Sequence, residues 1–289
     1  MKNKALHTFS NKTVLVTGCS TGIGYCVATG LQKRGYRVYA TARKASDVEI
    51  LQKQGLTALQ LDLDDTASIT SCVNHILAQT GGRIDVLFNN GAYGQPGAVE
   101  DLTRDVMRAQ LETNLLGTME LTNLVIPAMR HHGYGRIIQN SSVLGLISLP
   151  YRGAYNTSKY ALEGLTDTLR LELQGTGIQV SLIEPGPIES EFRKNALHAY
   201  QKNIDRENSA HRDTYLRLER RLKKTGHAAP FTLPPDAVLK KVIHAIESSK
   251  PKVRYYVTFP TYLFATLKRI LPHNILDRVL LKISASENK

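Results

Sequence analysis

The fold of this chain is decided by the stretch TVLVTGCSTGIGYCVATGLQKRG, residues 13–35. It opens with a short run of β-branched and aliphatic residues, a composition typical of a strand buried on both faces. Three glycines follow, Gly18, Gly22 and Gly24, and the residues after them have the apolar spacing of a helix. A strand that turns through glycines into a helix predicts the first unit of a nucleotide-binding α/β fold.

The same stretch has chemistry that suits a dinucleotide. Glycines let the backbone come close to a pyrophosphate, and the N-terminus of the next helix offers free N–H groups and a partial positive charge. Ser20 and Thr21 lie between the glycines and add hydroxyl donors. The alternative is an ordinary tight turn between a strand and a helix, but the flanking elements favour the dinucleotide site.

Further strand-like runs alternate with amphipathic helical stretches along the chain. Such alternation predicts parallel strands joined by crossover helices, and near-continuous apolar runs predict strands covered on both faces. We therefore expect an α/β fold with a doubly wound parallel sheet, the Rossmann fold. The runs are RVYATAR (37–43), LTALQLDL (56–63), IDVLFNNG (84–91), RIIQNSS (136–142) and IQVSLIEPG (178–186).

The regular pattern lapses after Ser190. Residues 191–224 have the pattern of a polar helix before the stretch PFTLPPDAV restarts the fold, so we expect a helical substrate lid over about residues 190–230. A C-terminal extension covers about residues 255–289. No repeat or low-complexity linker divides the chain, and residues 1–289 are expected to form a single domain.

The composition, 42% hydrophobic and 21% charged residues, is ordinary for a globular protein. No segment approaches the roughly 18 apolar residues of a membrane span, and the polar start of the chain is unlike a secretory signal, so we expect a cytoplasmic protein. The cysteines, Cys19, Cys26 and Cys72, are odd in number and lack metal-ligand spacing. They are expected to be small buried residues, and no metal site is predicted.

The formal net charge of +12 is concentrated in two segments. Residues 191–225 contain ten Lys/Arg against five Asp/Glu, and residues 250–289 contain eight against two. Neither segment interleaves its cations with stacking aromatics or carries a known nucleic-acid motif, so nucleic-acid binding is not expected. A solvated face, or attraction to anionic substrates and membrane surfaces, is the favoured interpretation.

The second strand indicates which dinucleotide binds. An acid that would bond the adenine ribose hydroxyl is expected near Ala42, but Arg43 and Lys44 follow instead. Because an arginine pairs with a 2′-phosphate and an acid would repel it, this loop favours NADP (NADPH) over NAD. Asp62, after the third strand, is placed either to meet the adenine amino group or to cap the end of its own loop.

The stretch AYNTSKYALEGL, residues 154–165, places Tyr155 and Lys159 four residues apart in a predicted helix. Positions i and i+4 share one face, so the ammonium can lie near the phenol oxygen. A neighbouring cation stabilises phenolate and is expected to lower the pKa of Tyr155, which would make it a usable acid or base near neutral pH. Alone, the same spacing is also common on solvated helix faces.

Taken together, the motifs resemble the short-chain dehydrogenase/reductase family, and the resemblance covers nearly the whole chain. In detail they are most similar to bacterial NADP-dependent aldehyde reductases related to retinol and 17β-hydroxysteroid dehydrogenases. The motifs are TGCSTGIG (17–24), NNGAYG (89–94), TNLLG (113–117), RIIQNSSVLG (136–145), YNTSK (155–159) and IEPGPIES (183–190).

The resemblance implies four catalytic residues. Tyr155 would be the proton donor or acceptor, and Lys159 its electrostatic partner and a ligand of the nicotinamide ribose. Ser142, rather than Ser141, matches the residue that holds the substrate carbonyl. Asn114 would anchor a water relay, although a buried amide that satisfies local backbone groups is an equally physical interpretation.

The resemblance also implies the cofactor contacts. The chain departs from the usual Asn-Asn-Ala-Gly motif, because Gly91 and Ala92 are exchanged. Ser190 replaces the customary threonine near the carboxamide. The implied contact residues, beyond those of the glycine loop and besides Arg43 and Asp62, are Ile23, Leu63, Asn90, Gly91, Ala92, Tyr155, Lys159, Pro185, Gly186, Ile188 and Ser190.

We therefore expect an NADP-dependent oxidoreductase that interconverts an aldehyde or ketone and its alcohol. The partner would be a small apolar substrate, because the loop SVLGLISLPYRGAY (142–155) and the stretch FTLP (231–234) offer apolar lining. The resemblance also implies a homo-oligomer. The alternatives are a 3-oxoacyl-thioester reductase, a steroid or retinol dehydrogenase, and a non-enzymatic NADP-sensing or scaffolding protein.

The C-terminal stretch YYVTFPTYLFATLKRILPHNILDRVLLKI, residues 255–283, mixes aromatic, aliphatic and basic residues. Its apolar residues are expected to cover the substrate pocket or a subunit partner. A weak peripheral contact with an anionic membrane is the alternative. Pro260 and Pro272 interrupt the stretch, which excludes a membrane-spanning helix here.

Overall fold

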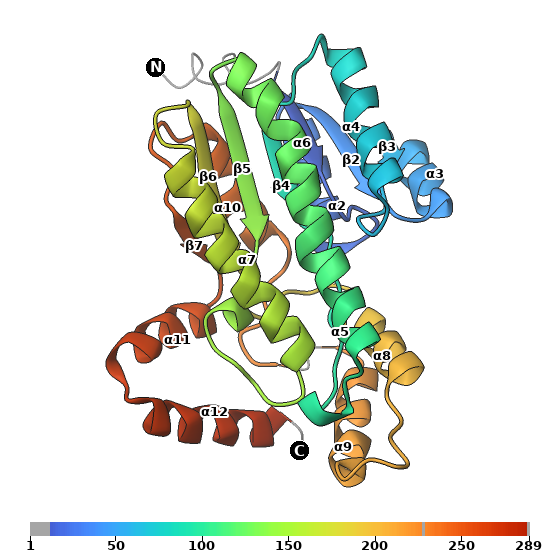
Figure 1. The fold of residues 1–289 in the computed structure, drawn as a ribbon, viewed down its shortest axis with the longest axis vertical. Helices are drawn as coiled ribbons and strands as arrows, with labels where there is room; N and C mark the ends of the chain where they lie inside the picture. The colour runs from blue at the N-terminus through green and yellow to red at the C-terminus, as the bar shows by residue number, and fades with distance from the viewer. Residues whose placement is uncertain (1–11, 227–228, 288–289) are drawn as a thin grey trace.

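The computed structural model describes residues 12–226 and 229–287. Its centre is a seven-stranded parallel sheet with the strand order β3-β2-β1-β4-β5-β6-β7 (Figure 1). The order reverses between β1 and β4, as in a doubly wound sheet, so the predicted Rossmann fold is confirmed. The strands are β1 (Thr13–Val16), β2 (Arg37–Ala42), β3 (Thr57–Gln60), β4 (Val86–Asn89), β5 (Gly135–Asn140), β6 (Ile178–Glu184) and β7 (Arg254–Tyr256).

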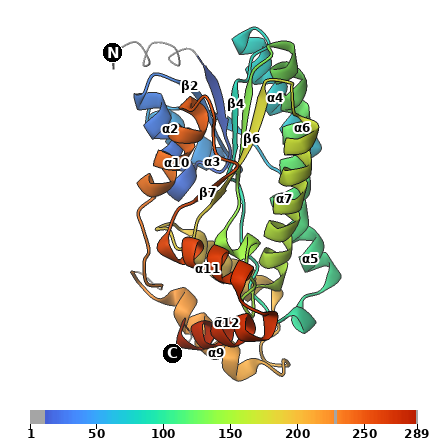
Figure 2. The same cartoon turned by 90° about the vertical axis from the view of Figure 1, so that its left-hand side faces the viewer.

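Helices cover both faces of the sheet (Figure 2). One layer consists of α2 (Gly22–Lys33), α3 (Ala45–Lys53) and α10 (Asp236–Glu247), which pack apolar side chains on the sheet. The other consists of α4 (Thr66–Thr80), α6 (Gly117–His131) and α7 (Gly153–Glu172). The short helix α5 (Arg104–Leu111) runs into α6 through one wide turn over Glu112–Leu116. Burial on both faces explains why the strand sequences lack a polar side.

The sequence predicted six of the strands and missed β7. This strand has only three residues, which is too few for a periodic pattern, and two of them, Tyr255 and Tyr256, were assigned to the amphipathic C-terminal stretch. Pairing decides its state instead: β7 lies parallel to the end of β6, with Arg254 opposite Leu182 and Tyr256 opposite Glu184. The partner strand thus overrides a weak local signal.

The expected lid region is helical, as predicted, but it forms two helices where the sequence pattern suggested one stretch of polar helix. They are α8 (Phe192–Asn203) and α9 (Arg212–Lys223). Each buries an apolar face against the other, and Tyr200, Tyr215 and Leu218 form the centre of this contact. Tyr215 is fully buried, and its hydroxyl accepts a 2.8 Å hydrogen bond from the Ala98 amide. The apolar faces of these two short helices can pack on each other only because the chain reverses direction between them.

The C-terminal stretch also forms two helices, α11 (Phe259–Ile270) and α12 (His273–Glu287). Pro260 lies in the first turn of α11, and Pro272 separates the two helices, as predicted. Figures 1 and 2 show both helices beyond the carboxyl ends of the strands. Among the residues described, no helix combines the length and apolar content needed to cross a membrane. The polar residues 1–11, on which the expectation of no secretory signal depends, lie outside the described residues.

Cys19 and Cys72 are buried, as expected, whereas Cys26 is only partly buried. Burial raises the pKa of the Cys19 and Cys72 thiols to about 12, and burial with the nearby Asp236 raises that of Cys26 to about 11. The thiols therefore stay protonated at neutral pH and are poor nucleophiles. The described residues hold no cluster of His, Cys, Asp and Glu that would suit a metal ion.

Candidate active site

The glycine loop after β1 has the geometry of a phosphate cradle. Gly18 and Gly22 have positive φ angles of 68° and 58°, which favour glycine. A Cβ atom on Gly24 would lie 2.1 Å from the Gly18 carbonyl oxygen, so the first turn of α2 packs directly on the loop. Ser20 and Thr21 are exposed beside the start of this helix. The predicted pyrophosphate site therefore fits the local backbone.

Hydrogen bonds join the glycine loop to the ends of β4 and β5. Thr17 Oγ1 accepts 2.8 Å hydrogen bonds from the Asn90 and Gly91 amides. Asn90 Nδ2 donates to the Thr17 and Gly18 carbonyls at 3.0 and 3.1 Å, and Asn140 Nδ2 donates to Asn90 Oδ1 at 2.9 Å. Sequence reasoning missed Thr17 and Asn140. The available signal was a polar side chain at the carboxyl end of a buried strand.

Close packing around position 91 accounts for the exchange of alanine and glycine at positions 91 and 92. A Cβ atom on Gly18 would lie 2.8 Å from Gly91 Cα, so the two glycines pack backbone to backbone. A Cβ atom on Gly91 would lie 3.1 Å from Leu63 Cδ1 and 3.3 Å from Thr17 Oγ1. Glycine at 91 thus relieves a tight contact between three loops, and Ala92 next to it lines the cavity.

Helix α7 presents Tyr155 and Lys159 on one face, as predicted. Lys159 is buried, and its Nζ donates a 2.7 Å hydrogen bond to the Asn140 carbonyl. The same Nζ lies 5.6 Å from the centroid of the Tyr155 ring. Burial lowers the pKa of Lys159 to about 8, and the carboxylate of Glu163 opposes this change.

The expectation that Lys159 lowers the pKa of Tyr155 is wrong for the structure as it stands. Burial raises the pKa of Tyr155 to about 12, and the one opposing contact is a hydrogen bond with the Ser142 hydroxyl. Burial of the phenol is the physical reason, and the Lys159 ammonium is directed to the Asn140 carbonyl. Ser142 also accepts a 3.1 Å hydrogen bond from the Leu144 amide, which fixes its hydroxyl beside Tyr155.

A cavity of about 650 Å³ opens at the carboxyl ends of β1, β4, β5 and β6. Five predicted residues do not line it: Gly24, Arg43, Asp62, Leu63 and Asn114. The predicted residues that line it are Gly18, Ser20, Thr21, Gly22, Ile23, Asn90, Gly91, Ala92, Ser142, Tyr155, Lys159, Pro185, Gly186, Ile188 and Ser190.

Asn114 lies in the wide turn between α5 and α6 and is buried. Its side chain accepts from the Tyr93 amide at 3.1 Å and donates to the Tyr93 carbonyl at 2.9 Å and to Ser158 Oγ at 3.1 Å. Ser158 in turn donates to the Tyr155 carbonyl at 2.8 Å. The Asn114 amide thus forms hydrogen bonds with nearby backbone and hydroxyl groups and, through Ser158, supports the backbone of Tyr155. Its part in a water relay stays a prediction.

The expected adenine side lies at the ends of β2 and β3. Arg43 is exposed there, and Ala42 is buried. Asp62 Oδ1 accepts a 3.1 Å hydrogen bond from the Asp64 amide, and the Asp62 amide donates to Ser68 Oγ at 2.9 Å. These bonds are those of a loop-end cap, and the contact of Asp62 with adenine stays a prediction.

The other end of the cavity has both apolar and polar lining. Val143, Leu144 and Leu149 line it, together with Phe192 of α8, whose ring centroid lies 5.3 Å from that of Tyr155. The expectation that the stretch FTLP lines the pocket holds only for Thr232; Phe231 is 58% exposed. Its phenyl ring contacts Phe259 instead of the cavity. Polar lining at this end comes from Arg152, Arg193, Asn195 and Arg221.

Helices α11 and α12 support the cavity from outside. Phe264, Leu276 and Leu280 pack around Ile147 and the apolar loop that follows β5. A Cβ atom on Gly186 would lie 2.1 Å from Thr258 Oγ1, so the start of α11 packs on the loop after β6. The buried apolar residues of the C-terminal stretch thus pack on the loop that lines the pocket, as one of the two interpretations predicted, while others, such as Ile270 and Leu281, are exposed.

Comparison with known proteins agrees with this geometry. Residues 12–201 match the family model of the short chain dehydrogenases. The chain is 43% identical to the uncharacterized oxidoreductase YbbO of Escherichia coli K12 over 93% of its length and 94% of that protein. It is 33% identical to human retinol dehydrogenase 8, over 90% of its length and 85% of that protein.

A solved short-chain dehydrogenase/reductase from Burkholderia phymatum, in complex with NAD, has the same fold. The TM-score is 0.77 at 21% identity, and the match covers 94% of this chain and 96% of that one. The order of motifs, the sheet and the two full-length relatives agree, and the chain therefore belongs to the short-chain dehydrogenase family of oxidoreductases.

Proposed function

We propose that the protein is an NADP-dependent oxidoreductase that interconverts an aldehyde or ketone on an apolar carbon skeleton and its alcohol. One observation supports this most strongly. The hydroxyls of Tyr155 and Ser142 contact each other in the cavity that also contains the glycine loop, and Lys159 lies behind them. When bound, the nicotinamide donates or accepts the hydride.

In this proposal Tyr155 exchanges a proton with the substrate oxygen. Its raised pKa keeps the phenol protonated at neutral pH, which is the form that donates a proton during reduction. Ser142 donates a hydrogen bond to the same oxygen, where negative charge develops. Lys159 supplies a buried positive charge within 5.6 Å of the ring and would bind the nicotinamide ribose.

The choice of NADP rests on the loop after β2. Arg43 and Lys44 are exposed there, and no acid occupies positions 42–44. An exposed guanidinium suits a 2′-phosphate because it can pair with two of its oxygens. A carboxylate at this loop, which would bind the ribose hydroxyl of NAD, is missing from the sequence.

The substrate class rests on the lining of the cavity. Val143, Leu144, Leu149 and Phe192 give apolar lining to the cavity that contains Tyr155. The name of one relative, retinol dehydrogenase 8, points to an apolar alcohol as well. A steroid or retinol dehydrogenase is therefore a close alternative, and a 3-oxoacyl-thioester reductase is a second one.

The decisive experiment measures NADPH and NADH oxidation by the purified protein across panels of alkyl aldehydes, apolar ketones and acyl thioesters. We expect turnover of the apolar aldehydes or ketones with NADPH. Preference for acyl thioesters would support the second alternative. Tight NADPH binding with no turnover of any substrate, in either direction, would instead indicate a sensing or scaffolding protein and refute the proposal.

A further inference from the structure

Three arginines line the cavity, although the proposed reaction requires no guanidinium. Arg152 directly precedes α7, Arg193 lies in the first turn of α8, and Arg221 lies in the last turn of α9. All three side chains are partly buried. Glu189 is the one acidic residue among the described residues that line the cavity, so these three positive charges face one negative charge.

The hydrogen bonds of Arg193 bring two of these arginines into the same region. Its Nη1 donates a 2.9 Å hydrogen bond to the Lys224 carbonyl, and its Nη2 donates to the Gly226 carbonyl. These bonds join the start of α8 to the end of α9, where Arg221 also lies. Carbonyl acceptors do not neutralise a guanidinium, which has further N–H donors. Arg193 therefore presents a positive charge to the cavity.

The third arginine follows a residue with an unusual backbone conformation. Tyr151 has a φ angle of 61°, in the left-handed region that a non-glycine residue rarely adopts. Its ring packs on His211 and Tyr215 of the lid, with ring centroids 5.4 and 6.1 Å away, whereas the next residue, Arg152, lines the cavity. Strained residues of this kind persist where their surroundings hold them, often at ligand sites. Packing of Tyr151 thus ties the start of α7 to the lid and leaves Arg152 at the cavity.

Apolar residues lie next to the arginines along the same walls. The ring of Phe192 contacts that of Tyr155, with centroids 5.3 Å apart, and Arg193 directly follows Phe192 in α8. Leu149 lines the cavity three residues before Arg152. A ligand that extends from Tyr155 to the arginines would therefore suit these walls best if it had an apolar body and an anionic end.

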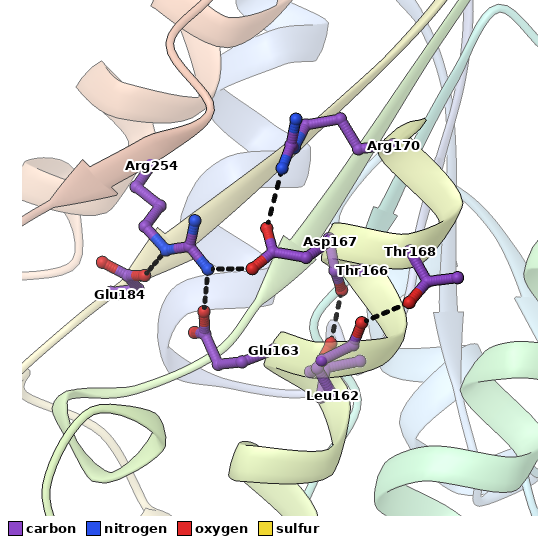
Figure 3. Close-up of polar contacts among 9 residues, drawn as sticks. Leu162, Glu163, Thr166, Asp167, Thr168, Arg170, Glu184 and Arg254 are labelled. Atoms are coloured by element: carbon purple, nitrogen blue, oxygen red, sulfur yellow. Dashed lines mark hydrogen bonds and ion pairs between the residues drawn. The ribbon is translucent and has the colours of Figure 1, made fainter. Parts of the chain in front are cut away.

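Charges are balanced in the opposite way around Arg254 of β7, which lies outside the cavity (Figure 3). Its Nη2 lies 3.1 Å from Glu163 Oε2 and 2.7 Å from Asp167 Oδ2, and its Nε lies 3.1 Å from Glu184 Oε1. Three carboxyl groups of the protein thus surround one guanidinium. In the cavity three guanidinium groups accompany one carboxylate, which leaves positive charge that an anionic ligand would match.

We propose that Arg152, Arg193 and Arg221, the arginine cluster, bind an oxyanion at the end of the substrate away from its carbonyl group. The substrate would then be an apolar aldehyde or ketone with a terminal carboxylate or phosphate. A guanidinium has paired N–H donors that match two oxygens of either group. This inference rests on the proposed function, because it names the class of substrate for the same site.

The direct test compares aldehydes that share one carbon skeleton, with NADPH as the reductant. The probes are ω-oxoalkanoates, their methyl esters and ω-oxoalkyl phosphates, in a series of chain lengths from butyl to dodecyl. At the best length we expect kcat/KM for an anionic aldehyde to exceed that of the ester by at least about tenfold, because the ester accepts hydrogen bonds without ionic attraction. The carboxylate and phosphate arms identify which oxyanion the cluster prefers.

Arg221→Gln is the main variant, because Arg193 also holds the end of α9. It should reduce the ratio of kcat/KM between the anionic aldehyde and its ester by about tenfold, since one guanidinium is lost. Arg221→Lys keeps the charge without the paired donors and should retain part of the preference. The matched control is Arg220→Gln, an exposed position on the same helix that does not line the cavity, and it should keep the parental ratio.

Three results would overturn the inference. The first is a parental ratio near one at every chain length. The second is an equal loss of turnover for anionic and neutral aldehydes in Arg221→Gln, which would mean that the arginine only supports the lid. The third is a loss of NADPH affinity in Arg221→Gln, by fluorescence titration, that accounts for the whole effect; the cluster would then belong to the cofactor phosphates.

Failure of the inference is separable from failure of the proposed function. If the esters are reduced with no preference for the anionic aldehydes, the proposed function stands and only the arginine cluster is refuted. If no aldehyde is reduced, the proposed function fails, and calorimetry then measures binding of ω-hydroxyalkanoates and their methyl esters to the NADPH complex. Tighter binding of the acid, lost in Arg221→Gln, would support the anion site; equal binding of acid and ester would refute it.

Discussion

The ammonium of Lys159 donates a 2.7 Å hydrogen bond to the main-chain carbonyl of Asn140, and the side chain of Asn140 donates to Asn90 at 2.9 Å. Asn90 in turn binds the carbonyls of Thr17 and Gly18. A continuous chain of hydrogen bonds thus joins the candidate catalytic helix to the glycine loop. The two halves of the site are held in register by asparagine side chains at the ends of β4 and β5.

Asn140→Ala tests this connection. It removes the donor to Asn90 Oδ1 and should destabilise the protein by about 1–3 kcal/mol, the range for a buried polar group left unpaired. NADPH affinity should fall as well, because Asn90 loses its fixed orientation against the loop. Gln139→Ala is the control: it is buried on the same strand but contacts Thr122. Fluorescence titration that gives equal NADPH affinity in both variants would contradict the connection.

Tyr155→Phe should lower turnover by at least about 100-fold while NADPH binding stays nearly unchanged, because only the proton-transferring hydroxyl is lost. The comparison variant is Tyr160→Phe on the same helix, whose hydroxyl donates to the Leu146 carbonyl at an exposed position. Steady-state rates and NADPH titration of both variants check the result. Turnover of Tyr155→Phe within tenfold of the parent protein would remove Tyr155 from the mechanism.

Arg43→Ala should weaken NADPH binding much more than NADH binding, since only NADPH has the 2′-phosphate that the guanidinium would pair. Arg37→Ala, at the other end of the same strand, is the matched loss of one exposed cation. Dissociation constants for both dinucleotides are the measurement. Equal weakening of the two dinucleotides by Arg43→Ala would show that the arginine does not select the cofactor.

Glu184→Gln should become more stable relative to the parent protein as pH rises from 5 to 8. Burial and Glu163 raise the pKa of Glu184 from 4.5 to about 9, so the folded parent retains a proton that the unfolded chain has released in this range. Folded-state proton uptake makes parental stability fall with rising pH, by no more than about 1.4 kcal/mol per pH unit for one group. Glutamine has no such proton.

Urea unfolding of both proteins at several pH values measures this difference. The range ends at pH 8 because Lys159, whose pKa is lowered from 10.5 to about 8, has the opposite effect above it. A stability difference that is constant from pH 5 to 8 would mean that Glu184 is ionised in the folded protein.

Most of the fold could be predicted from the sequence because its signals are local. The apolar runs that became β1 to β6 and the glycines at 18, 22 and 24 each impose a state on their own neighbourhood. β7 and the cluster around Arg254 depend on partners far along the chain, which no periodic pattern encodes. In the sequence, Glu163 is an ordinary polar residue of a helix, and only the packing of α7 in the structure shows that its side chain is buried.

The candidate site also combines features that the local sequence predicts with features that depend on distant partners. Tyr155 and Lys159 lie on one helical face as their spacing requires, but the direction of the lysine was not predictable. Its ammonium turns to a carbonyl at the end of β5, and burial raises the pKa of Tyr155 instead of the lysine lowering it. Thr17 and Asn140 were missed for a related reason: their hydrogen bonds join three strand ends that are distant in sequence.

The last prediction concerns the C-terminal helices and membranes. Phe264, Leu276 and Leu280 are buried against the loop that lines the pocket, so much of the apolar surface of α11 and α12 is already covered. Six large apolar side chains of these helices remain exposed near their basic residues, among them Ile270 at 67% and Leu281 at 58%; the others are Phe259, Tyr262, Leu263 and Ile275. Because part of the apolar face is already packed on the pocket loop, the exposed side chains and a few cations support only weak interfacial binding.

We therefore expect the protein to sediment weakly with anionic vesicles at physiological salt and to be released as salt rises, because the attraction is mainly electrostatic. The informative variant is Ile270→Ser/Leu281→Ser, which removes exposed apolar side chains and leaves the packed face intact; deletion of the helices would instead uncover the pocket loop. Strong, salt-resistant sedimentation that this variant abolishes would show that the C-terminal helices bind membranes, and that covering the pocket is not their only role.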